Sequence, residues 1–121
     1  MAKIAVVEDN AAVRQELCGF IAQYAQESGQ LLEVTPFADG SQIVEPYRPG
    51  FDIIFLDIEM PTLGGMPTAE RIRLLDPDVV LIFVTNMAQY AIRGYEVDAL
   101  DFVLKPVSYY PVSYTHLTLP T

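Results

Sequence analysis

The sequence is poor in cysteine, in long apolar runs and in targeting signals. Its single cysteine, Cys18, excludes an intrachain disulfide and fits a reducing compartment. No apolar run approaches the roughly 18 residues of a membrane span. The first ten residues, MAKIAVVEDN, contain neither the apolar core nor the cleavage site of a signal peptide. We therefore expect a protein of the cytoplasm that has no membrane partner.

Basic residues and nucleotide-binding loops are also scarce. Seven Lys and Arg residues stand against 16 Asp and Glu residues, which gives a net charge of −9. Such a surface repels nucleic-acid phosphates, so we expect no nucleic-acid binding by this chain alone. The charge suits a cation or a basic protein partner, or serves solubility alone. The chain contains neither G-x-x-x-x-G-K-[ST] nor G-x-G-x-x-G, so a bound nucleotide is not expected.

What the sequence does contain is a regular alternation of strands and helices. The 121 residues are 51% hydrophobic, which indicates one compact domain. Apolar periodicity and turn residues predict strands at 3–7, 31–37, 51–56, 79–84 and 100–104, and helices at 11–27, 40–47, 66–75 and 88–93. The third and fourth strands are apolar throughout, as in strands covered on both faces. The pattern predicts an α/β fold with a doubly wound, five-stranded parallel sheet.

Polar side chains follow four of these predicted strands. Glu8 and Asp9 follow the first, Asp57 the third, Thr85 the fourth and Lys105 the fifth. In a parallel sheet these positions share one edge, where ligands bind. Clustered carboxylates repel one another unless a cation is present, and their hard oxygen atoms suit Mg²⁺. With a lysine and a hydroxyl beside them, the carboxylates indicate a site for phosphoryl transfer in which aspartate is the nucleophile.

Four sequence blocks resemble a known family. VVEDN, FLDIEMP with Gly65 after it, VTN and DFVLKP occur in the order and at the separations typical of response-regulator receiver domains, over residues 3–110. More narrowly, NMAQYAIRGYEVDALDFVLKPVSYYP resembles receivers that precede a LytTR DNA-binding domain. The resemblance implies a flavodoxin-like strand order, 2-1-3-4-5, and control of an output domain by a sensor histidine kinase.

The resemblance also implies roles for individual residues in the acidic cluster. Asp57 would accept the phosphoryl group. The side chains of Glu8, Asp9 and Asp57 would hold Mg²⁺, and Glu59 would contribute its backbone carbonyl while its side chain faces solvent. Such a domain catalyses only its own modification, so we do not expect an enzyme that acts on an external substrate.

Further roles implied by the resemblance concern the last two strands. Thr85 and Lys105 would contact the phosphoryl group. Thr85 and Phe102 would form the conformational switch, and Lys105–Pro106 matches a peptide bond that is usually cis in the family. Thr85 could instead merely end its strand, and Phe102 could be an ordinary core residue.

The end of the chain departs from the family pattern. Residues 112–121, VSYTHLTLPT, are a poor helix by propensity and resemble translated cloning sequence. We therefore expect a receiver domain at 1–110, a non-native tail at 111–121, and a final helix that is missing or replaced. An apolar face left open in this way favours a homodimer or a domain-swapped oligomer. Gly64, where receivers often carry an acid, is expected to loosen its loop but to spare the site.

Two other functions fit parts of the pattern. An aspartate-nucleophile phosphohydrolase places a second aspartate two residues after the nucleophile, but that position here is Glu59. A protein-interaction module of the same fold would not respond to phosphate, and Glu8 and Asp9 would then simply favour the N-terminus of the following helix.

Overall fold

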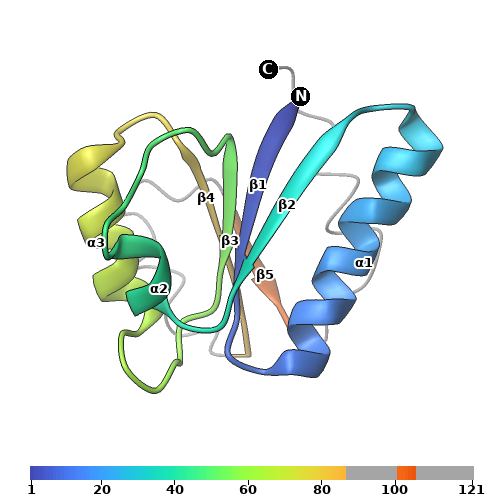
Figure 1. Cartoon of the computed structure of the whole chain (residues 1–121). Helices are drawn as coiled ribbons and strands as arrows, with labels where there is room; N and C mark the ends of the chain where they lie inside the picture. The colour runs from blue at the N-terminus through green and yellow to red at the C-terminus, as the bar shows by residue number, and fades with distance from the viewer. Residues whose placement is uncertain (87–100, 106–121) are drawn as a thin grey trace.

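The structure is a computed structural model that describes residues 1–86 and 101–105 (Figure 1). Of residues 101–104, the last strand, it describes the backbone alone. Its elements are β1 (Ala2–Val7), α1 (Ala11–Ser28), β2 (Leu32–Phe37), α2 (Gly40–Val44), β3 (Ile53–Leu56), α3 (Gly65–Leu75), β4 (Val80–Thr85) and β5 (Asp101–Leu104). The strands form one parallel sheet in the order β2-β1-β3-β4-β5. This confirms the predicted fold class and strand order.

Helices cover both faces of the sheet, with α1 on one side and α2 and α3 on the other (Figure 1). Successive strand residues therefore pack into two different cores. Ile53 and Phe55 of β3 pack with Leu17 and Ile21 of α1, whereas Ile54 of β3 packs against the α2 and α3 side. The continuous apolar runs follow from this arrangement, because neither face of a central strand meets water.

Helix α1 begins and ends where its flanking residues predict. The Asn10 side chain accepts a hydrogen bond from the backbone N–H of Val13 at 3.1 Å, which caps the N-terminus. Gly29 follows the helix with a φ of 72°, a left-handed conformation that favours glycine. The helix begins just after the acidic residues at the end of β1 and leads the chain away from them.

Two boundaries differ from the sequence prediction by more than one residue. Helix α2 ends at Val44 instead of residue 47, because Pro46 removes an N–H and keeps Glu45 out of the helical conformation. Strand β3 begins two residues later than expected, at Ile53. Leu75 ends α3 as predicted and is 61% exposed.

Pro36 lies in β2, an edge strand, where the missing N–H of proline is tolerated. Other predictions fall on the undescribed part of the chain. The predicted helix at 88–93, the side chain of Phe102, the peptide bond to Pro106 and the tail at 111–121 lie outside the described residues. None of the helices described within residues 1–86 and 101–105 has the length and apolar character of a membrane span.

Candidate functional site

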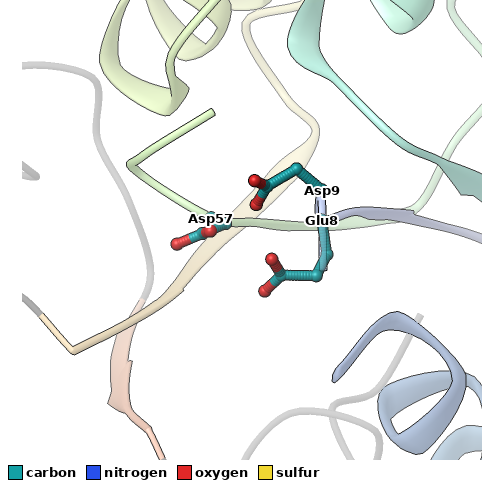
Figure 2. A group of neighbouring side chains, drawn as sticks. All are labelled: Glu8, Asp9 and Asp57. Atoms are coloured by element: carbon teal, nitrogen blue, oxygen red, sulfur yellow. The ribbon is translucent and has the colours of Figure 1, made fainter. Parts of the chain in front are cut away.

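The acidic residues predicted to form the site lie together at the C-terminal ends of β1 and β3. Val7 of β1 is paired with Leu56 of β3, and the N–H of Asp57 donates to the carbonyl of Val7 at 3.0 Å. Glu8, Asp9 and Asp57 each offer a carboxylate oxygen, and these three oxygens lie within 4.8 Å of one another. Figure 2 shows the three side chains converging from two adjacent strand ends. The parallel pairing of β1 with β3 thus brings together acids that are about fifty positions apart in the sequence.

Lys105 supplies a positive charge to this cluster. It follows β5, and its backbone N–H donates to the carbonyl of Thr85 at 2.8 Å. The Lys105 Nζ lies 2.8 Å from Glu8 Oε1 and 3.4 Å from Asp57 Oδ2. One ammonium group therefore bridges two carboxylates that come from different strands.

Burial makes the electrostatics of the cluster strong. Glu8 is 1% exposed and Asp57 is 5% exposed, whereas Asp9 is open to solvent. Burial raises the pKa of Glu8 to about 7, although the hydrogen bond from Lys105 acts in the opposite direction. Burial by itself lowers the pKa of Lys105, but its hydrogen bond to Glu8 and the nearby charge of Asp57 outweigh that effect and raise it. The ammonium group therefore stays charged at neutral pH.

Backbone contacts hold the turn that carries the first two acids. The N–H of Asn10 donates to Glu8 Oε2 at 3.1 Å, and Arg14 Nη1 donates to the carbonyl of Glu8 at 2.7 Å. Asp57 Oδ1 accepts from the N–H of Ile58 at 2.8 Å. Arg14 was not predicted from the sequence. Its place in the first turns of α1, five residues after an acidic pair, is the signal that could have identified it.

The carboxylates open into a cleft of about 660 Å³ at this edge of the sheet. Its lining consists of residues from several strand ends, namely Glu8, Asp9, Asn10, Asp57, Ile58, Glu59, Met60, Pro61, Asn86 and Lys105. The Glu59 side chain is exposed, as predicted. Thr85 is buried and comes immediately before the lining residue Asn86.

Gly65 permits the segment after Asp57 to fold back against the start of α3. Its N–H donates to the carbonyl of Ile58 at 2.8 Å. A Cβ atom at this position would lie 2.1 Å from the Asp57 carbonyl oxygen, which is too close for any other residue without a backbone shift. The glycine that follows the FLDIEMP block is therefore a packing requirement next to the site.

The donor set fits a small, hard cation. Three carboxylates with closely spaced oxygens, two of them buried, provide the ligands that Mg²⁺ prefers. The cleft leaves room for an anionic group beside them, and Lys105 faces that space. The arrangement can hold a divalent ion, neutralise an anionic oxygen and present a carboxylate as a nucleophile.

Comparisons with known proteins identify the class. Residues 4–110 match the response regulator receiver domain, so the chain belongs to this family of two-component signalling domains. The chain is 32% identical over 110 residues to the sensory transduction protein LytT of Oceanobacillus iheyensis, which covers 87% of this chain and 42% of LytT. This sequence similarity agrees with the predicted relation to receivers of the LytTR type. The chain spans less than half the length of this relative.

Solved structures show the same fold. The response regulatory domain of mrkE from Klebsiella pneumoniae has a TM-score of 0.80 and 28% identity, covering 92% of this chain and 88% of that one. The response regulator TrrA from Thermotoga maritima, solved in complex with Mg²⁺-BeF, has a TM-score of 0.72 and 27% identity, covering 90% of each chain.

Proposed function

We propose that this receiver domain accepts a phosphoryl group on Asp57 from a sensor histidine kinase in a Mg²⁺-dependent reaction. The observation that carries the proposal is the convergence of Glu8, Asp9 and Asp57 within 4.8 Å, with the Lys105 Nζ 3.4 Å from Asp57. In the transfer, an oxygen of Asp57 forms a bond to phosphorus while the bond between phosphorus and the histidine nitrogen breaks. Burial of Asp57 keeps this reaction away from bulk water.

The residues present fit a magnesium site. The carboxylates of Glu8, Asp9 and Asp57 would hold the ion, and Glu59 would add its backbone carbonyl from the cleft wall. When bound, Mg²⁺ supplies positive charge that offsets the charge of the transferred group. The likeness to TrrA, which was solved with Mg²⁺-BeF, supports this assignment.

Lys105 and Thr85 are proposed to contact the transferred phosphoryl group. Lys105 already lies beside Asp57, and its backbone N–H is hydrogen-bonded to the carbonyl of Thr85, so the two residues are directly linked. Phe102 precedes Lys105 by three residues in β5 and remains our candidate for the aromatic part of the switch. The signal would reach the effector through this end of the sheet.

The output of the switch is proposed to be a separate domain. Because LytT is more than twice as long as the matching segment, a LytTR-type DNA-binding domain is the natural effector. We propose that phosphorylation biases homodimerisation, that the protein works in the cytoplasm, and that it modifies only itself. We also retain the proposal that residues 111–121 are a non-native tail.

The test is an intact-mass measurement after incubation with acetyl phosphate and Mg²⁺. We expect the mass to increase by one phosphoryl group, and we expect Asp57→Asn or a chelator to abolish the increase. Asp52→Asn is the matched control, because Asp52 is an exposed acid just before the other end of β3 and lies outside the cleft lining. It should leave the increase unchanged.

Two results would replace the proposal with another function. Release of phosphate from a small phosphoester without a stable mass increase would indicate a phosphohydrolase. No mass increase, together with no response to beryllium fluoride and Mg²⁺, would indicate an interaction module that does not respond to phosphate.

A further inference from the structure

One buried carboxylate outside the cleft binds the loop that forms a wall of the cleft. Asp39 lies in the turn between β2 and α2, is 7% exposed and does not line the cleft. Its Oδ2 accepts from the backbone N–H groups of Ser41 at 2.9 Å and Leu63 at 3.0 Å, and its Oδ1 accepts from that of Thr62 at 3.0 Å. Asp39 thus joins two segments that are separated by more than twenty positions.

The loop held in this way is the one that follows Asp57. Glu59 and its two successors line the cleft, and Thr62 and Leu63 come directly after them. Among the contacts of the described residues, the hydrogen bond from the Gly65 N–H to the Ile58 carbonyl closes the ends of the loop. The two bonds to Asp39 fix its middle. The position of the Glu59 backbone therefore depends on a side chain that never reaches the cleft.

The turn that carries Asp39 is itself well supported. The carbonyl of Phe37, at the end of β2, accepts from the N–H of Glu8 at 3.0 Å, so this turn is tied to the acidic end of β1. Gly40 packs so closely on the loop that a Cβ atom there would lie 2.6 Å from the Leu63 carbonyl oxygen. Asp39 thus connects the acids after β1 with the loop after β3 through a short, closely packed route.

The carboxylate is suited to hold backbone N–H groups. Burial alone would raise its pKa, but the hydrogen bonds from Ser41, Thr62 and Leu63 outweigh that effect and lower the pKa below the usual range. An ionised carboxylate makes stronger hydrogen bonds to backbone N–H groups than a neutral acceptor does.

We propose that Asp39 is a positioning residue of the phosphoacceptor site, which holds the loop so that the Glu59 backbone faces the carboxylates of the cluster. This inference rests on the function proposed above, because two of its measurements, Mg²⁺ binding and phosphorylation, presuppose that function. Groups that orient metal ligands typically change metal affinity by roughly 10- to 100-fold when they are removed. Asp39 does not contact a proposed metal ligand and acts through the loop, so we expect its removal to weaken Mg²⁺ binding by roughly 10-fold, the lower end of that range.

The test variant is Asp39→Ser in the full chain. Serine still caps α2 well but is too short to reach the loop, so the substitution separates the two tasks of Asp39. We expect faster hydrogen exchange at the Thr62 and Leu63 amides by NMR, and roughly 10-fold weaker Mg²⁺ binding by calorimetry. At saturating Mg²⁺, phosphorylation by acetyl phosphate should recover most of its rate.

Gln42→Ala is the control, because Gln42 Oε1 accepts from the Ala38 N–H at 2.8 Å in the same turn without an observed bond to the loop. It should leave the exchange rates and the Mg²⁺ affinity unchanged. Asp39→Asn, which keeps one acceptor oxygen, should give a smaller effect in the same direction and replaces Asp39→Ser if the latter does not fold.

The outcomes separate this proposal from the proposed function. Wild-type exchange rates and Mg²⁺ affinity in both Asp39 variants would overturn the positioning role, as would an equal loss in Gln42→Ala. If the wild-type chain neither binds Mg²⁺ nor takes up a phosphoryl group, the proposed function itself fails.

Discussion

Removal of the Lys105 charge is the sharpest test of the electrostatics at the site. Its Nζ lies 2.8 Å from Glu8 Oε1 and 3.4 Å from Asp57 Oδ2, and both carboxylates are at least 94% buried. Lys105→Met keeps most of the aliphatic chain but leaves these acids without their cation. Breaking a buried ion pair on one side typically costs about 3–5 kcal/mol, so we expect the free energy of unfolding at pH 8 to fall by about 3 kcal/mol.

This loss should depend on pH in a defined direction. Burial raises the pKa of Glu8 to about 7 from an ordinary value of 4.5, even with Lys105 opposing the shift. A carboxyl group with a raised pKa in the folded state contributes stability that is complete below pH 4.5 and is lost as the pH rises through about 7. Without Lys105 the pKa of Glu8 rises further, so the group is neutral at pH 5.5. The part of the destabilisation that comes from Glu8 should therefore disappear at pH 5.5, so the loss of stability should be smaller there than at pH 8.

The assay is urea unfolding followed by circular dichroism at pH 5.5 and pH 8, without metal. Lys3→Met is the matched control, because Lys3 is the other lysine of the chain and its side chain is exposed. It should change the stability by less than about 0.5 kcal/mol at either pH. An equal loss for Lys105→Met at both pH values, or no loss beyond that of Lys3→Met at pH 8, would refute the reasoning.

Three further substitutions test other contacts. Gly65→Ala should lower stability by about 1–3 kcal/mol in urea and slow phosphorylation, because its Cβ would meet the Asp57 carbonyl oxygen at 2.1 Å. Tyr47→Phe should lower stability by about 1.5–3 kcal/mol, because the buried Tyr47 hydroxyl donates to Asp76 Oδ2 at 2.6 Å. Gly19→Ala should raise the melting temperature, with a gain of about 0.5–1 kcal/mol, because Gly19 is an exposed helical residue and its Cβ would contact nothing within 4 Å.

Each of these substitutions has a matched control. Gly64→Ala places its Cβ 3.0 Å from a single carbonyl oxygen and should cost less than Gly65→Ala. Tyr24→Phe removes only a 3.4 Å contact with Gln30 at the surface and should be close to neutral. Gly29→Ala should destabilise the protein, in contrast to Gly19→Ala, because Gly29 has a φ of 72°. The reverse order within any pair would contradict the contact on which that prediction depends.

The sequence by itself determined the elements and their order. Apolar runs bounded by turn residues located the strands, and the three-and-four spacing in α1 located its buried face, because these signals are local. The acids after β1 and β3 could be placed at one edge from the rule that parallel strands share their C-terminal side.

Only the tertiary structure decided which side chains actually meet. In the sequence, Asp39 is only the residue before the predicted helix at 40–47. In the structure, its carboxylate accepts hydrogen bonds from the backbone N–H groups of Thr62 and Leu63 in another loop. The sequence likewise gave no sign that Tyr47 reaches Asp76 across twenty-nine positions. Periodicity records which face of an element is apolar, but the contacts between loops depend on distances and side-chain directions set when the layers pack together. For that reason the acids of the site could be found from the sequence, and the residues that hold them in place could not.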